Sequence, residues 1–169
     1  MKKIILSAFV VLGLTLTLTS CGPTQKDALK YNDEIVAVQK TLTPIHEAFI
    51  NQLDGHNVDS LKMTHANFMA SAKTSLEFCE KIQPFADKRD YLDASIEYFK
   101  VVKGLADNEG KSMVEIMSRD SAQISDADIA KVNEYAAKFD SEYEKVLAKV
   151  QTAQQAFAKE LKFDLIDKP

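Results

Sequence analysis

The sequence predicts an all-α protein, an elongated up-down-up-down four-helix bundle that follows a cleaved lipoprotein signal peptide. Three observations support this prediction. Apolar residues recur at intervals of three and four between Lys26 and Leu161, which is the spacing that lines one face of a helix. Strand patterns are nearly absent from that region, and turn-forming residues divide it into four segments. Before these segments, a short apolar run ends at a cysteine.

Residues 1–20 have the order of a secretory signal. Lys2 and Lys3 precede an uncharged, mostly apolar run at residues 4–18. This run is shorter than the roughly 20 apolar residues that a membrane-spanning helix needs. Residues 18–21, LTSC, resemble a bacterial lipobox, in which the chain is cut immediately before the cysteine and the thiol receives a diacylglycerol. The alternative is a soluble exported protein that is cleaved nearby.

Cys21 is the predicted lipid attachment site. Its thiol is nucleophilic enough to form a thioether, and the small residues Thr19 and Ser20 give a peptidase access to the backbone. Two or three acyl chains would anchor the protein firmly, whereas one chain holds a protein only reversibly. We therefore expect an extracytoplasmic protein of the bacterial cell envelope. The absence of Asp after Cys21 favours the outer membrane or the cell surface.

Charge and cysteine content narrow the possible partners. Cleavage before Cys21 removes Lys2 and Lys3 from the 21 basic residues and leaves all 25 acidic ones, so the net charge becomes −6. This acidic balance argues against binding to nucleic acid and against electrostatic adhesion to an anionic bilayer. The remaining chain is long enough for one domain with a core. Cys79 is then the one unmodified cysteine, and we expect it to be buried and inert rather than reactive.

The first two predicted helices each carry one apolar stripe. The first stripe contains Ala28, Tyr31, Ile35, Val38, Leu42, Ile45 and Phe49, and it stops at Asp54-Gly55. The second contains Leu61, His65, Phe68, Ala72, Leu76, Cys79 and Ile82, and it stops at Pro84. Pro44 leaves open a three-helix, spectrin-like alternative in which the first helix bends. The stripe keeps its phase through Pro44, which favours the four-helix bundle.

The third predicted helix is interrupted by two glycines, and the fourth is the most regular. The third stripe contains Leu92, Ile96, Phe99, Val102, Ala106, Met113 and Ile116, with Gly104 and Gly110 as weak points. Ser125 and Asp128 form a capping pair before the fourth helix. Its heptad pattern contains Ile129, Val132, Ala136, Phe139, Tyr143, Val146, Val150, Ala153 and Phe157.

The predicted domain limits place the bundle close to a membrane. Residues 21–26 form the lipidated N-terminus and a short linker, residues 27–163 the bundle, and residues 164–169 a tail that folds back as a cap or frays. A linker of about five residues reaches roughly 17 Å. The turns at residues 54–58 and 119–125 would then point away from the membrane. A protein partner would meet these distal turns or the outer helix faces.

Four polar residues are predicted to lie at one level of the bundle. His46, His65, Glu109 and Tyr143 come from different helices, and all fall roughly 25–32 Å from the membrane end at 1.5 Å per residue. One interpretation is a pocket for a small ligand or a weakly bound metal, with His65 and Glu109 as polar contacts. The other is a hydrogen-bonded layer that fixes the register of the helices.

Motifs for catalysis or for a cofactor are missing from the sequence. None of His46, His56 and His65 follows a glutamate by three residues, as the ligands of a carboxylate-bridged metal bundle do. Haem-attachment motifs, zinc-binding cysteine pairs, Gly-rich phosphate loops and Gly-x-Ser-x-Gly elbows are also absent. We therefore predict a non-enzymatic protein and assign no cofactor and no metal ligand.

Two segments resemble a known group of proteins. Residues 31–39, YNDEIVAVQ, and 82–109, IQPFADKRDYLDASIEYFKVVKGLADNE, resemble a family of helical bacterial surface lipoproteins from spirochaetes and gut anaerobes. The most distinctive parts are Pro84-Phe85, Tyr98-Phe99 and Asn108-Glu109. That family has no assigned activity, so the resemblance implies lipidation and an all-helical fold and transfers no catalytic residue. The sequence thus predicts a membrane-anchored interaction or structural module. The alternative is a bundle that binds a small ligand or metal through the polar layer.

Overall fold

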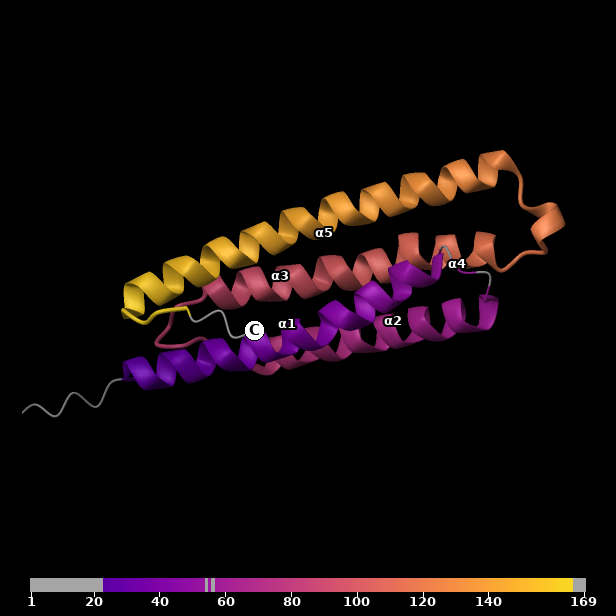
Figure 1. Cartoon of the computed structure of the whole chain (residues 1–169). Helices are drawn as coiled ribbons and strands as arrows, with labels where there is room; N and C mark the ends of the chain where they lie inside the picture. Colours follow the sequence, from indigo (N-terminus) through magenta and orange to yellow (C-terminus); the bar gives the residue numbers. More distant parts are fainter. Residues whose placement is uncertain (1–22, 54, 56, 166–169) are drawn as a thin grey trace, which may run out of the picture.

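Residues 23–53, 55 and 57–165 form a helical bundle in the computed structural model, which describes these residues. Four long helical segments run alternately up and down (Figure 1). They are α1 (Gln25–Leu53), α2 (Val58–Lys81), a composite third segment, and α5 (Asp126–Leu161). The composite segment consists of α3 (Asp90–Leu105), the π-helical η1 (Ala106–Gly110) and α4 (Lys111–Met117), and the short 3₁₀ helix η2 (Ser121–Gln123) connects it to α5. The predicted all-α four-helix bundle is confirmed.

Several sequence predictions fall outside this description. The predicted signal peptide and Cys21 lie outside the described residues, as do His56 and residues 166–169. Within the described part of the chain, no helix is both long enough and apolar enough to cross a bilayer. Lipid attachment at Cys21 therefore stays a prediction.

Helix ends follow the local chemistry of the sequence. The Asn57 side chain caps α2 by accepting a hydrogen bond from the Ser60 backbone N–H at 2.9 Å. Ser125 and Asp128 form the predicted reciprocal capping box at the start of α5, with backbone-to-side-chain distances of 3.1 and 3.2 Å. Helix α1 continues through Pro44 to Leu53. The bent, three-helix alternative is therefore not adopted.

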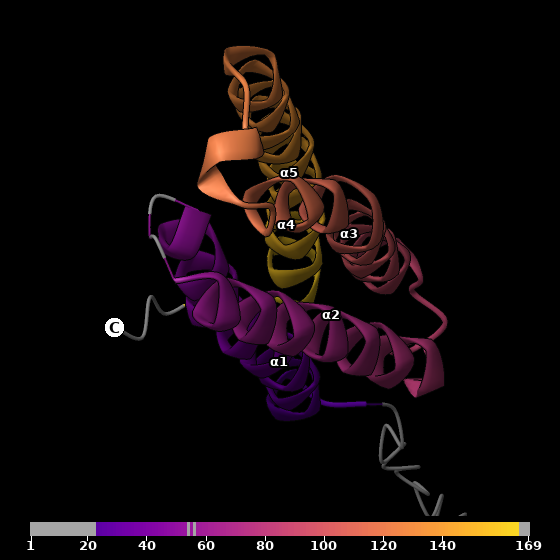
Figure 2. The same cartoon turned by 90° about the vertical axis from the view of Figure 1, so that its right-hand side faces the viewer.

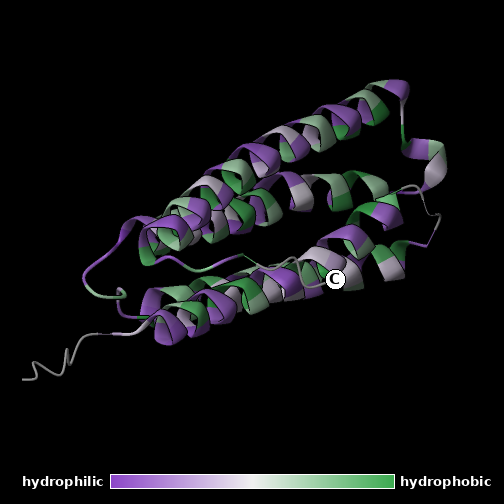
Figure 3. Ribbon diagram, turned by 60° about the vertical axis from the view of Figure 1, so that its left-hand side comes forward, coloured by the Kyte–Doolittle hydropathy of each residue, from purple (hydrophilic) through white to green (hydrophobic). Residues whose placement is uncertain are grey.

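The helices pair around a long core rich in aromatic side chains. Helix α1 packs along α2, α2 along α3, and α3 along α5 (Figures 1 and 2). Figure 3 shows hydrophobic residues on the sides of the helices that face one another. The largest fully buried aromatic side chains are Phe49, Phe68, Tyr91, Tyr98, Phe99 and Phe139. The predicted stripes therefore form the core, except that Ile129 is 41 % exposed in the first turn of α5.

The third segment and the C-terminal turn depart from regular α-helix. Gly104 and Gly110, predicted as weak points, lie within one continuous helical segment that changes to π-helix at Ala106–Gly110. After α5, Lys162 adopts a left-handed conformation with φ of 59°. The Phe163 N–H then donates to the Ala158 carbonyl at 3.1 Å, and Phe163 is buried. The chain therefore turns back on itself directly after α5.

Candidate functional site

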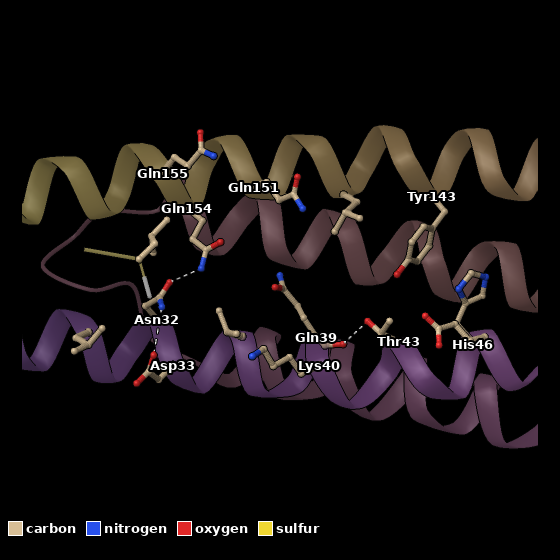
Figure 4. A pocket seen from close by; sticks show the side chains of 15 residues that line it. Asn32, Asp33, Gln39, Lys40, Thr43, His46, Tyr143, Gln151, Gln154 and Gln155 are labelled. Carbon is tan, nitrogen blue, oxygen red and sulfur yellow. Dashed lines mark hydrogen bonds between the residues drawn. The ribbon is translucent and has the colours of Figure 1, made fainter. Parts of the chain in front are cut away.

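The seam between α1 and α5 is an open groove. Helices α1 and α5 make far less contact than the pairs α1–α2, α2–α3 and α3–α5. The groove has a volume of about 800 Å³. It follows the long axis of the bundle and lies between the two helices in Figure 4. We call it the α1/α5 groove, with a proximal end near the start of α1 and a distal end near His46.

Residues at helical spacing on both helices form the walls of the groove. Helix α1 contributes Leu29, Asn32, Asp33, Val36, Gln39, Lys40, Thr43, His46 and Glu47. Helix α5 contributes Tyr143, Leu147, Gln151, Gln154 and Gln155, and Leu165 follows from the tail. Intervals of three, four and seven residues place these side chains on one face of each helix. Carboxamides are prominent on both walls, and the three charged residues include both signs.

A hydrogen bond between two of these carboxamides spans the groove near its proximal end. The Gln154 Nε2 donates to Asn32 Oδ1 at 2.8 Å. Further along, Gln39 and Gln151 point toward each other from opposite walls (Figure 4). The Gln39 Nε2 is buried and has no hydrogen-bond partner among the described residues. Because an unpaired buried donor costs about 1–3 kcal/mol, a group that accepts from Gln39 would be stabilised there.

Stacked rings form the distal end of the groove. The His46 ring stacks on the Tyr143 ring at 4.7 Å and on the Phe139 ring at 5.0 Å. Burial lowers the pKa of His46, while the nearby Asp140 and Glu47 carboxylates act in the opposite direction. The His46 Nε2 is buried without a hydrogen-bond partner in the described part of the chain. A largely neutral imidazole with one unused nitrogen therefore borders the groove.

His65 lies elsewhere, against the π-helical turn. Its Nε2 is 2.8 Å from the Ala106 carbonyl oxygen, and the residue is buried. Because a carbonyl oxygen can only accept, this nitrogen carries the proton. The missing side chain of Gly110 makes room for the ring, since a Cβ there would lie 3.1 Å from Nε2. His65 therefore joins α2 to η1.

Glu109 forms a separate ion pair with α5. Its side chain is 9 % exposed, and Lys138 Nζ donates to its Oε1. The hydrogen bond to Glu109 is the main cause of the raised pKa of Lys138. The pair ties the π-helical turn of the third segment to α5.

The four residues predicted to form one polar layer thus have three different sets of partners. His46 and Tyr143 touch each other at the end of the α1/α5 groove. His65 contacts the Ala106 carbonyl, and Glu109 pairs with Lys138. In the described part of the chain, no three His, Cys, Asp or Glu side chains are grouped so as to hold a metal ion. The ligand-binding role of these residues stays a prediction.

The carboxamides of the groove are the site residues that the sequence analysis missed. Asn32 and Gln39 lie one heptad apart on α1, and Gln151, Gln154 and Gln155 are clustered on α5. The available signal was a run of amides beside the apolar stripe on two helices. It was missed because the interval patterns of the stripes show which residues face the core and not how closely two helices approach each other.

Comparisons with protein-family models, with curated proteins and with solved structures found no match to this chain. The resemblance to helical surface lipoproteins therefore stays a prediction.

Proposed function

We propose that this protein is a lipid-anchored, non-enzymatic binding module of the bacterial cell envelope, and that its α1/α5 groove holds an extended peptide segment of a partner protein. The supporting observation is an open groove of about 800 Å³ with carboxamides on both walls. Two buried nitrogen atoms in it, Gln39 Nε2 and His46 Nε2, have no partner among the described residues.

The dimensions of the groove suit an extended chain. Its wall on α1 runs from Leu29 to Glu47, which is about 27 Å at 1.5 Å per residue. An extended peptide of about eight residues has the same length. A rounded small molecule would fill one part of such a groove, whereas a peptide contacts it throughout.

The chemistry of the walls also suits a polypeptide backbone. A carboxamide offers both N–H donors and a carbonyl acceptor, which are the groups that pair with backbone C=O and N–H. Leu29, Val36 and Leu147 lie between the polar residues and provide apolar contacts for side chains. Asp33, Lys40 and Glu47 include both signs of charge, so the walls do not favour a polyanion.

Lipid attachment at Cys21 would set the orientation of the groove. Helix α1 begins at Gln25, only a few residues after Cys21, so the bundle would stand on the membrane surface. The groove follows the long axis of the bundle and would open sideways toward other proteins of the envelope. In cells fed with an alkyne fatty acid, the chain should become labelled, and Cys21→Ala should abolish the label. Unchanged labelling of the variant would refute lipidation at this residue.

Photo-crosslinking in intact cells tests the groove. p-Benzoylphenylalanine at Gln151 reports on the groove, and the same residue at Lys73, an exposed position on α2, is the matched control. Mass spectrometry of the products identifies what was captured. We expect the Gln151 variant to capture a defined segment of another polypeptide, and the Lys73 variant not to do so. Equal capture at both positions, or a sugar or lipid as the product, would refute peptide binding in the groove.

A small-ligand site at the distal end of the groove is the second candidate. The observation that favours it is the buried, unpartnered His46 Nε2 beside the Tyr143 ring. Thermal melting with divalent metal ions and with a panel of small molecules tests this candidate, because a bound ligand raises the melting temperature by mass action. A rise that His46→Phe removes would support it, and an unchanged melting temperature across the panel would exclude the compounds tested.

A further inference from the structure

The α1/α5 groove presents hydrogen-bond donors that lack acceptors. Gln39 Nε2 and His46 Nε2 are buried without a partner among the described residues, and both side chains lie between α1 and α5 in Figure 4. A carboxamide nitrogen can only donate, and a neutral His46 ring donates from Nε2 when its proton is on that nitrogen. Tyr143 accepts a hydrogen bond from the Tyr98 hydroxyl at 3.1 Å, so its own proton can be donated to a ligand. A ligand of this stretch therefore needs more acceptors than donors.

The spacing of the two buried donors fits one regular backbone conformation. Gln39 and His46 lie seven residues apart on α1, or about 10.5 Å along the helix axis. In a polyproline II helix, carbonyl oxygens three residues apart point to the same side and repeat about every 9.3 Å. On one edge of a β-strand, carbonyl oxygens repeat about every 6.6 Å, so neither the first nor the second repeat matches. An α-helix uses its carbonyl oxygens internally. Polyproline II therefore fits best.

Proline-rich chains also suit the walls of the groove. A proline residue has a carbonyl oxygen and no N–H, so acceptors outnumber donors in such a chain. Its fixed φ favours polyproline II before binding, which reduces the entropy lost when the chain is ordered. Leu29, Val36 and Leu147 provide apolar surface for the proline rings. The groove wall of about 27 Å on α1 corresponds to about nine residues in this conformation.

We propose that the partner segment held by the α1/α5 groove is proline-rich and adopts the polyproline II conformation, with carbonyl oxygens three residues apart accepting hydrogen bonds from Gln39 Nε2 and His46 Nε2. The Tyr143 hydroxyl donates to a further carbonyl oxygen at the distal end. The two α1 donors thus set the conformation of the bound chain, and the apolar wall residues take its proline rings. This assignment rests on the proposed function, because it names the class of peptide that the groove holds.

Selection from a random peptide library tests the class of peptide. Peptides of about nine random residues, the length that the groove holds, are displayed on phage and selected on the full chain purified in detergent. Groove binders are those lost on Thr43→Glu, because the new carboxylate would lie on the wall between the two donors and repel a carbonyl oxygen. Thr74→Glu on α2 is the matched control, since both threonines are exposed and both hydroxyls donate to the backbone one helical turn earlier.

We expect groove binders to carry prolines three residues apart at least tenfold more often than the library does. Groove binders without this enrichment, or with the alternating apolar residues of a strand, would overturn the proline-rich class while the groove stays a peptide site. If no selected peptide distinguishes Thr43→Glu from Thr74→Glu, peptide binding in the groove is itself refuted. The two failures are therefore distinguishable.

Substitutions of His46 test the assigned hydrogen bond. A selected peptide should bind His46→Gln about as tightly as the unchanged chain, because glutamine keeps an N–H donor of similar reach. His46→Phe should weaken binding about three- to tenfold, which is the effect of one lost hydrogen bond. Circular dichroism and the melting temperature of both variants verify that the bundle is folded. Equal affinities of the two variants for the peptide would overturn the hydrogen bond from His46.

Discussion

Replacing Gly110 by alanine is expected to destabilise the protein, whereas replacing Gly104 by alanine is expected to stabilise it. A Cβ at residue 110 would lie 3.1 Å from His65 Nε2 and 3.2 Å from Cδ2 of the same ring. A Cβ at residue 104 would meet no atom within 4 Å. Both glycines lie in the same continuous helical segment. The two variants therefore share one change in helix propensity and differ in the space available.

The magnitude follows from two opposing effects. Alanine is favoured over glycine inside a helix by about 1 kcal/mol, and this gain applies to both positions. At residue 110 the His65 ring has to move, and its buried hydrogen bond to the Ala106 carbonyl is lost or weakened at a cost of about 1–3 kcal/mol. The free energies of unfolding of the two variants should therefore differ by about 1–3 kcal/mol. Gly104→Ala should be the more stable.

Urea denaturation of the full chain, followed by circular dichroism, measures both free energies. For a chain of this size, 1 kcal/mol corresponds to a shift of about 2–4 °C in the melting temperature. A double variant isolates the cause, because Gly110→Ala in a His65→Ala background should no longer destabilise. If Gly110→Ala and Gly104→Ala stabilise the protein equally, the contact between His65 and the π-helical turn does not contribute as argued.

Three further predictions concern the core, a histidine and the buried thiol. Phe68→Ala should lower the free energy of unfolding by about 3–5 kcal/mol, because Phe68 is fully buried, whereas Phe78→Ala at a 38 % exposed position should cost far less. The pKa of His46 is lowered by burial, so His46 binds a proton more readily in the unfolded chain than in the folded one. The free energy of unfolding should therefore decrease as the pH falls below about 6.5, by up to about 1.4 kcal/mol for each unit by which folding lowers the pKa of His46. Denaturation of His46→Phe between pH 8 and 5 should show a weaker decrease. Burial raises the pKa of Cys79 to about 12, so in chains that carry Cys21→Ala iodoacetamide should alkylate Cys79 in urea and not in the native protein, and rapid alkylation of the native chains would contradict that burial.

The fold could be predicted because apolar residues recur at intervals of three and four over many helical turns. The stripe that includes Ile35, Leu42 and Phe49 is buried as the interval pattern indicates, and the Ser125–Asp128 capping box marks the start of α5. The pattern was less informative where packing changes locally. Ile129 continues the heptad and is nevertheless 41 % exposed in the first turn of α5. Periodicity identifies the face of a helix, and the neighbouring helices decide whether that face is covered at each level.

The candidate site could be predicted only in part from the sequence, because the partners of a side chain depend on the direction in which it points. Counting residues placed His46 and Tyr143 at one level, and the two rings do stack. The same count placed Glu109 beside them, but this carboxylate points to Lys138 on α5. A π-helical turn shifts the direction of the following side chains relative to an α-helix, and the sequence carries no clear signal for that turn. Height along a helix is therefore easier to predict than the partner of a given side chain.

The carboxamides in the loosely packed seam between α1 and α5 are the strongest argument that the α1/α5 groove has a function. In a bundle built for stability alone, apolar side chains would close the seam between the first and last helices, because burial of apolar surface is the main stabilising contribution. Here that seam carries Asn32, Gln39, Gln151 and Gln154. One pair of these carboxamides is satisfied by the bond between Gln154 and Asn32, and the Gln39 Nε2 is left without a described partner. Positions that break the pattern of an otherwise consistent fold are those where function is expected. Replacing Gln39 and Gln151 together by leucine should therefore stabilise the protein while abolishing capture of a partner peptide by p-benzoylphenylalanine placed at Leu147, another residue of the groove wall. A double variant that keeps full capture would show that these carboxamides are not needed for binding.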